Sequence, residues 1–208
     1  FSYWEQDLFK AKYDNIIIGS GFSGLWLAFF LKKNNPDINI AIFERSVISK
    51  GASTKNAGFA CFGSPSEIIQ NTKDIGWDET LKWTKKRLDG INIIKENFGS
   101  AIDFDPCGAS EVFDSKEEYQ ANIENIEILN KYLKETLGLS NHFYDDTEIL
   151  SKCNFTGFCG AISNEAEASI HSAKLYYALY KSLVSQDVKF FFGTTILNFD
   201  ANQGIVLT

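Results

Sequence analysis

Histidine and cysteine, the side chains that most often bind zinc, are scarce in this sequence. The 208 residues include two histidines and four cysteines, and no two cysteines form a CxxC pair. A zinc site therefore has too few ligands, and we predict that the protein holds no metal. We expect free, buried thiols, as in a reducing compartment, at Cys61, Cys107, Cys153 and Cys159.

Long apolar runs, positive charge and methionine are also lacking. The longest apolar run, Leu25 to Leu31, is far shorter than the roughly 20 residues that span a bilayer, and no secretory signal precedes it. The net charge of −7 repels the phosphate backbone of nucleic acids. We therefore expect a cytoplasmic protein with no transmembrane segment and no nucleic-acid partner. Because methionine is absent even at position 1, we expect a chain that has lost its initiator or is a piece of a longer one.

What the sequence does contain is a strand, a glycine-rich turn and a helix near its start. Residues 13–18 are typical of a buried parallel strand because three isoleucines follow one another. Residues 22–33 are expected to form a helix that is apolar nearly all round and must be covered on most sides. A second strand is expected over residues 38–43, with Glu44 directly at its end. This order of elements predicts an α/β fold.

The turn between the first strand and the helix has the GxGxxG pattern, in the residues Gly19, Ser20, Gly21, Phe22, Ser23 and Gly24. The first glycine allows the tight turn, the second lets the backbone approach a diphosphate, and the third lets the helix pack against the strand. Free N–H groups and the positive end of the helix dipole then face the phosphate charge. Glu44 follows the last glycine by 20 residues (44 − 24 = 20), where a carboxylate can bind ribose hydroxyls. The pattern predicts dinucleotide binding, with a purely structural glycine turn as the alternative.

The residues after the second strand help to distinguish between dinucleotides. Glu44 disfavours NADP because a carboxylate repels a 2′-phosphate, although the neighbouring Arg45 weakens that argument. The next segment is small and rich in hydroxyl groups, whereas a plain NAD dehydrogenase usually has an ordinary helix there. Small side chains let the main chain lie against a flat ring system, and polar ones donate to phosphate and ring oxygens. The segment comprises Gly51, Ala52, Ser53, Thr54, Lys55, Asn56, Ala57 and Gly58.

The stretches GSGFSG and FERSVISKGASTKNAG resemble the amino-terminal half of FAD-dependent oxidoreductases of the D-amino acid oxidase family, which includes glycine oxidase, sarcosine oxidase and glutamylputrescine oxidase. The resemblance resumes at residues 170–175 and continues through residues 188–207, while the middle of the chain matches only in layout. The chain departs from the family's D-P-x-K-L helix start, because His171 and Ser172 replace Asp-Pro.

The resemblance implies that FAD is the cofactor, and that it is bound non-covalently because no histidine occurs where some relatives attach their flavin. The glycine turn would hold the pyrophosphate, Glu44 the adenosine ribose, residues 52–58 the diphosphate and isoalloxazine, and the Ile196 main chain the adenine. The implied cofactor-binding residues are Gly19, Ser20, Gly21, Phe22, Ser23, Gly24, Glu44, Arg45, Ala52, Ser53, Thr54, Lys55, Asn56, Ala57, Gly58 and Ile196.

The resemblance also implies the domain layout: a Rossmann-like FAD-binding domain with an inserted α+β segment of a substrate domain, in a truncated chain. We expect residues 1–99 to form the first part of the FAD-binding domain and residues 100–168 to form the substrate-domain segment. Residues 169–208 are expected to form the second, incomplete part of the FAD-binding domain. Helices are predicted over residues 78–98 and 115–137, the second opened by a Ser–Glu capping box.

The implied activity is oxidation of the C–N bond of a small-molecule amine or amino acid by hydride transfer to flavin. Two alternatives stay open at this point, namely an NAD-dependent dehydrogenase and a non-catalytic FAD-binding module. In the family, the groups that hold the substrate lie largely in the part that would follow residue 208. We therefore assign no catalytic residue.

Overall fold

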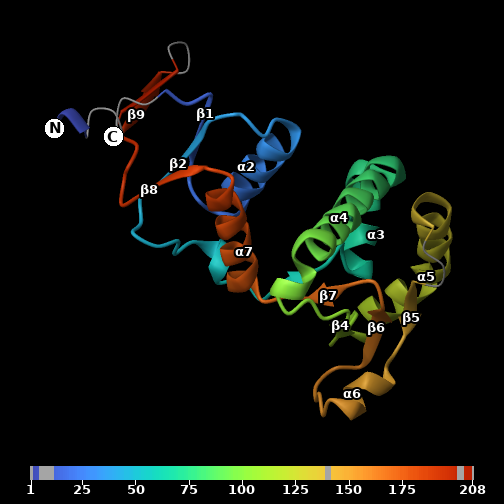
Figure 1. Ribbon diagram of the computed structural model, residues 1–208. Coiled ribbons are helices and arrows are strands. Elements are labelled where there is room, and N and C mark those ends of the chain that lie inside the picture. Colours follow the sequence, from blue (N-terminus) through green and yellow to red (C-terminus); the bar gives the residue numbers. More distant parts are fainter. Residues whose placement is uncertain (1, 5–11, 139–141, 201–203, 208) are drawn as a thin grey trace. The chain divides into compact units, whose positions relative to one another are not determined.

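The computed structural model describes residues 2–4, 12–138, 142–200 and 204–207 (Figure 1). Contacts divide the chain into two compact units, Phe1–Ala57 with Ser172–Thr208, and Gly58–His171. The insertion therefore begins at residue 58 by packing, whereas the sequence suggested residue 100. Residues 58–99 belong with the insertion because their helices share its hydrophobic core. Which of these residues serve the cofactor is a separate question and stays a prediction.

The first unit is built on the three-stranded parallel sheet β1–β2–β8. Its central strand is β2, in which Ile42 pairs with Ile17 on one side and Phe190 on the other. This is the arrangement of the first three strands of a doubly wound sheet, so the Rossmann-like α/β fold is confirmed. The unit contains β1 (Asn15–Ile18), α2 (Phe22–Asn34), β2 (Ile40–Glu44), the 3-10 turn η1 (Ala52–Thr54), α7 (Ser172–Ser185), β8 (Lys189–Phe192), β9 (Asn198–Asp200) and β10 (Ile205–Leu207).

The first strand and helix are less completely buried than the sequence predicted. Ile17 and Leu25 are buried, whereas Ile18 is 57% exposed and Leu27 is 51% exposed. Successive strand side chains point to opposite faces of a sheet. Because α2 and α7 pack against each other and Ile17 lies beside the first turn of α2, only the residues that face these helices are enclosed.

The second unit combines the antiparallel sheet β4–β6–β5 with three long helices (Figure 1). Helix α5 contacts all three strands, and α3 and α4 contact α5. A separate short pair, β3 with β7, joins residues 59–60 to residues 168–169. The unit contains β3 (Phe59–Ala60), α3 (Pro65–Ile75), α4 (Trp77–Phe98), η2 (Gly99–Ala101), β4 (Ala109–Phe113), α5 (Lys116–Leu137), β5 (Phe143–Asp145), α6 (Glu148–Lys152), β6 (Gly160–Asn164) and β7 (Ala168–Ser169).

The helices of the second unit begin and end close to the predicted residues. The Ser115 hydroxyl accepts a hydrogen bond from the Glu118 N–H and caps α5. Gly138 ends that helix in the left-handed conformation, with φ at +70°. Within the part of the chain that the structure describes, no helix combines the length and apolarity needed to cross a membrane.

The four cysteines are free, as predicted, but none of them is fully buried. Cys61, Cys107 and Cys153 are exposed, and only Cys159 is partly enclosed. Cys61 and Cys107 lie in loops that flank short strands, and Cys153 follows the end of α6. Cys159 packs against the buried cluster of the second unit but is only partly buried. The expectation of buried thiols was therefore wrong.

Candidate cofactor site

The glycines of the β1–α2 turn have the geometry that the sequence predicted. Gly19 has φ at +98°, a conformation that side chains disfavour. Its N–H donates to the Phe43 carbonyl at 2.7 Å, which ties the turn to β2. A Cβ on Gly24 would lie 2.2 Å from the Gly19 carbonyl oxygen and 3.1 Å from Ile17 Cγ2. Glycine at position 24 therefore lets α2 begin directly against β1.

The amino-terminal end of α2 is suited to an anionic ligand. Its first turn carries no acidic residue, and Gly21 at the N-cap offers no side chain. The first N–H groups of a helix have no partner within the helix, and here the Phe22 N–H donates to Ser53 Oγ at 2.9 Å. A Cβ on Gly21 would lie 3.2 Å from the same oxygen. Ser53 thus lies against the turn, next to the positive end of the helix dipole.

The Glu44 carboxylate is held at the end of β2 by donors from two neighbouring loops. Oε2 accepts hydrogen bonds from the N–H (3.0 Å) and hydroxyl (3.1 Å) of Ser20. Oε1 accepts one from the Ser46 N–H at 3.0 Å. Burial raises the pKa of Glu44, but these hydrogen bonds outweigh burial and hold the pKa below its ordinary value of 4.5. Glu44 is therefore ionised at neutral pH and ready to accept further hydrogen bonds.

The lowered pKa predicts how Glu44 affects stability. A carboxyl whose folded pKa is depressed contributes stability above its unfolded pKa, and this contribution is lost as the pH falls through the folded value. Urea unfolding without added FAD should therefore show the Glu44→Gln variant losing less stability than the wild type when the pH is lowered from about 7 to about 3. The exposed Asp37 offers a control in Asp37→Asn. Equal pH dependence in wild type and Glu44→Gln would contradict the hydrogen bonding described.

The segment after β2 folds around the side chain of Asn56. Its amide nitrogen donates to the carbonyls of Ala52 and Ser53, both at 3.1 Å. Its Oδ1 accepts a hydrogen bond from the hydroxyl of Ser172, the first residue of α7, at 2.6 Å. The Asn56 amide expected to face a ligand thus holds the shape of its own loop. Ala52, Lys55, Asn56 and Ala57 are the exposed residues of the segment that carry side chains.

Three of the residues expected at the site are placed differently from the rest. The Arg45 side chain is exposed. Ile196 lies between β8 and β9 rather than in a strand, although the Thr194 N–H bonds to the Glu44 carbonyl at 2.9 Å and keeps this segment beside β2. Gly58 belongs to the second compact unit, with φ at +79°. The remaining expected residues all lie in the first unit.

The sequence analysis missed two residues that help to hold the site, because they lie far along the chain from the glycine turn. The Tyr176 hydroxyl lies 3.2 Å from Ser20 Oγ, within the group of atoms that holds Glu44. Ser172 holds Asn56, as described above. The two residues are four positions apart on α7 and so share one face of the helix. The four-residue spacing can be read from the sequence, but the residues that Ser172 and Tyr176 contact cannot.

These features define the class of the protein as a dinucleotide-binding α/β protein. The turn lacks the side chains that would block a diphosphate. A carboxylate oxygen has two lone pairs, so Glu44, which is held by Ser20 and Ser46, can also accept a hydrogen bond from a ribose hydroxyl. The protein family described as FAD dependent oxidoreductase matches residues 14–208. The chain belongs to this family, and the predicted FAD cofactor is thereby confirmed. No curated protein sequence gave a significant match.

Solved structures share the fold along most of this chain. Glycine oxidase from Bacillus cereus is 20% identical, with a TM-score of 0.61, over 92% of this chain and 51% of that one. L-Proline dehydrogenase from P. horikoshii is 17% identical, with a TM-score of 0.62, over 91% and 46%. L-α-Glycerophosphate oxidase from Mycoplasma pneumoniae, with FAD bound, is 13% identical, with a TM-score of 0.65, over 89% and 46%. This chain thus spans about half the length of these proteins.

Proposed function

We propose that the protein is an FAD-dependent oxidoreductase that oxidises the C–N bond of a small amine or amino acid. The family match over residues 14–208 carries the proposal. Among similar structures, glycine oxidase and L-proline dehydrogenase are named for amino acids, whereas L-α-glycerophosphate oxidase is named for a substrate without nitrogen. The amine is therefore the finer part of the proposal, and it needs its own test.

In this proposal the chain holds FAD non-covalently through the first unit. The main-chain N–H groups of residues 19–24 that do not already donate to Phe43, Glu44 or Ser53 bind the diphosphate at the positive end of α2, with Ser53 beside them. Glu44, held by Ser20 and Ser46, accepts a hydrogen bond from the adenosine ribose. The Ile196 main chain, beside the end of β2, contacts the adenine. Residues 52–58 complete the expected contacts to diphosphate and ring system.

In this arrangement FAD and the protein have different roles in the reaction. When bound, FAD supplies the acceptor for the hydride removed from the substrate carbon next to nitrogen. The protein contributes position, because the glycines fix how closely the main chain approaches the diphosphate. Ionised Glu44 fixes the ribose, since its lowered pKa keeps it an acceptor at neutral pH. The oxidised substrate is an imine, which water hydrolyses.

Anaerobic reduction of the flavin in the full-length protein tests the proposal. We expect purified protein to show a flavin absorption band, and at least one compound from a panel of amines, N-methyl amino acids and D-amino acids to bleach it. Glycerol phosphate serves as the nitrogen-free comparison, and dithionite shows that the flavin can be reduced. Bleaching by glycerol phosphate alone would contradict C–N oxidation. A flavin that only dithionite bleaches would indicate a non-catalytic module, and failure to bind FAD would overturn the whole proposal.

A further inference from the structure

Two hydroxyl groups connect the Glu44 carboxylate to helix α7 within the first unit. The Ser20 hydroxyl donates to Glu44 Oε2 at 3.1 Å, and the Tyr176 hydroxyl lies 3.2 Å from Ser20 Oγ. Tyr176 follows Ser20 by 156 residues and belongs to α7. Of these three side chains, only that of Glu44 is proposed to contact FAD, so the other two would act on the cofactor through it.

The direction of these hydrogen bonds follows from the number of hydrogens that each group carries. Burial raises the pKa of Glu44, but the hydrogen bonds from Ser20 and Ser46 hold it below its ordinary value, so the ionised carboxylate can only accept. The single hydrogen of the Ser20 hydroxyl is therefore used on Glu44. Ser20 Oγ can meet Tyr176 only as an acceptor, so the Tyr176 hydroxyl is the donor.

Burial strengthens the link through Ser20. Ser20 is 0% exposed, so water cannot easily replace either partner of its hydroxyl. A hydroxyl that accepts one hydrogen bond becomes a better donor in the next, and this effect is larger where the local dielectric is low. Donation from Tyr176 therefore strengthens the hydrogen bond from Ser20 to Glu44.

The packing of α7 brings only one of two adjacent tyrosines to this point. Helix α7 packs against α2 and η1, and Tyr176 lies on the side that meets Ser20. Tyr177, the next residue, is 57% exposed, and Lys181 Nζ lies over its ring at 5.4 Å from the centroid. The two side chains differ little in chemistry, so Tyr177 offers a comparison for Tyr176.

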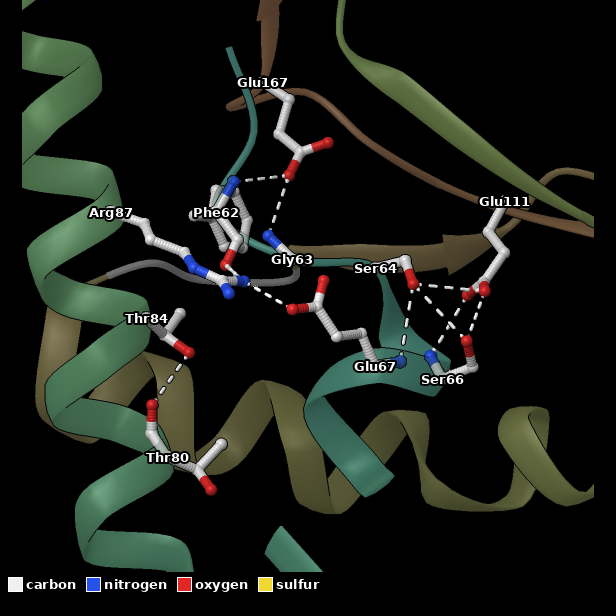
Figure 2. Close-up of polar contacts among 10 residues, drawn as sticks. All are labelled: Phe62, Gly63, Ser64, Ser66, Glu67, Thr80, Thr84, Arg87, Glu111 and Glu167. Carbon is white, nitrogen blue, oxygen red and sulfur yellow. Dashed lines mark hydrogen bonds and ion pairs between the residues drawn. The ribbon is translucent and has the colours of Figure 1, made fainter. Parts of the chain in front are cut away.

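Glu167, a buried carboxylate of the second unit, is held in a different way (Figure 2). Its Oε1 accepts the N–H groups of Phe62 at 2.8 Å and Gly63 at 3.2 Å. Arg87 donates to the Phe62 carbonyl at 3.3 Å. These hydrogen bonds run directly between side chains and one loop, and they account for the shape of that loop. At Glu44, by contrast, a tyrosine from a distant helix acts through an intervening hydroxyl.

We propose that Tyr176 is a positioning residue for FAD, which orients Glu44 through Ser20 toward the adenosine ribose. This inference rests on the proposed function for the contact between Glu44 and the ribose. It adds a residue that lies outside both the glycine turn and the segment after β2. Loss of the Tyr176 hydroxyl should leave FAD bound, but less tightly and over a narrower range of pH.

Tyr176→Phe in the full-length holoenzyme tests the proposal, because it removes the hydroxyl and keeps the ring. Dilution of the holoenzyme followed by ultrafiltration measures the FAD that is released. We expect the dissociation constant of FAD to rise about three- to tenfold, the effect of one net hydrogen bond. Ser20→Ala should raise it at least as much. Adding Tyr176→Phe to Ser20→Ala should change it by less than about twofold, because the Tyr176 hydroxyl then has no acceptor.

The pH at which FAD is released separates this role from simple packing. A weaker hydrogen bond from Ser20 should raise the pKa of Glu44. When the holoenzyme is acidified from about pH 7 to about pH 4, Tyr176→Phe should therefore release FAD at a higher pH than the wild type. Besides Tyr176, the groups around this carboxylate are Ser20 in the turn, Ser46 after β2, Phe192 of β8 and the exposed, charged Arg45.

Tyr177→Phe is the matched control, since it removes the same atom from the neighbouring, exposed tyrosine. Its dissociation constant and release pH should equal those of the wild type. An unchanged dissociation constant or release pH in Tyr176→Phe would overturn the proposal, as would an equal effect of Tyr176→Phe with and without Ser20→Ala. If Tyr176→Phe does not fold, Ser20→Ala decides, and an unchanged release pH in that variant overturns the proposal.

Glu44→Gln separates this inference from the proposed function. Wild-type affinity for FAD in Glu44→Gln would overturn the ribose contact and this inference with it. Weaker binding in Glu44→Gln, together with unchanged binding in Tyr176→Phe, would overturn this inference alone. FAD release is measured without substrate, so neither result depends on oxidation of the C–N bond.

Discussion

Gly24→Ala should lower the free energy of unfolding by about 3 kcal/mol or more and abolish FAD binding. The new Cβ would lie 2.2 Å from the Gly19 carbonyl oxygen, which is main chain and cannot rotate away as a side chain could. Ile17 Cγ2, at 3.1 Å, blocks the other direction. Helix α2 must then move away from β1, which displaces the N–H groups proposed to hold the diphosphate. Urea unfolding and the flavin content of purified protein measure the two effects.

Gly90→Ala is the control for this substitution. Gly90 also lies within an α-helix, α4, but a Cβ there would meet nothing within 4 Å. Alanine is the better helix former, so this variant should be stabilised by about 0.5–1 kcal/mol and should keep its flavin. Replacing glycine by alanine is thus expected to lower the free energy of unfolding at position 24 and to raise it at position 90. If both variants had the same free energy of unfolding as the wild type, the close contact described between α2 and β1 would be contradicted.

The local part of the site could be predicted from the sequence because it obeys short-range rules. The spacing of Gly19, Gly21 and Gly24 has one geometric solution once a strand precedes it and a helix follows. Glu44 is fixed by the same logic, since adjacent parallel strands bring their carboxyl ends together. The structure bears this out in the hydrogen bonds from Ser20, in the turn, to Glu44, at the end of β2.

The long-range part of the site could not be predicted in this way. Tyr176 reaches Ser20, and Ser172 reaches Asn56, only because α7 returns to pack beside α2 and η1. The spacing of residues along the sequence does not indicate which loop a distant helix will pack against. In the sequence, Ser172 was notable only as a departure from a family pattern, whereas in the structure its hydroxyl donates to Asn56 Oδ1.

The compact units of the structure differ from the predicted domain bounds for a related reason. Periodicity located the helix over residues 78–98 but did not say which core it joins. In the structure Ile68 and Ile91 belong to the same buried cluster as Leu129 and Ile162, which come from the inserted segment. Apolar residues at helical spacing predict that a face is buried, and the partner of that face is decided by tertiary packing.

Gly108→Ala is expected to have the second large effect, on the second unit. Gly108 has φ at +71°, and a Cβ would lie 2.4 Å from the Asn164 carbonyl oxygen. The residue lies just before β4, where Ala109 pairs with Asn164 of β6. Alanine should therefore separate the start of β4 from β6 and lower the free energy of unfolding by about 3 kcal/mol or more. Urea unfolding of the full-length protein measures the change.

Gly157→Ala separates the clash from the backbone conformation. Gly157 has φ at +86°, but a Cβ there would meet nothing within 4 Å. In Gly157→Ala the free energy of unfolding should fall only by the roughly 1–2 kcal/mol that alanine costs in a left-handed conformation. The difference in stability between the two variants then measures the effect of the contact with Asn164. The Gly108 N–H also donates to the Glu167 carbonyl at 3.0 Å, so displacement of Gly108 also breaks this link to the segment before β7. Equal losses of stability in the two variants would show that β4 tolerates the displacement.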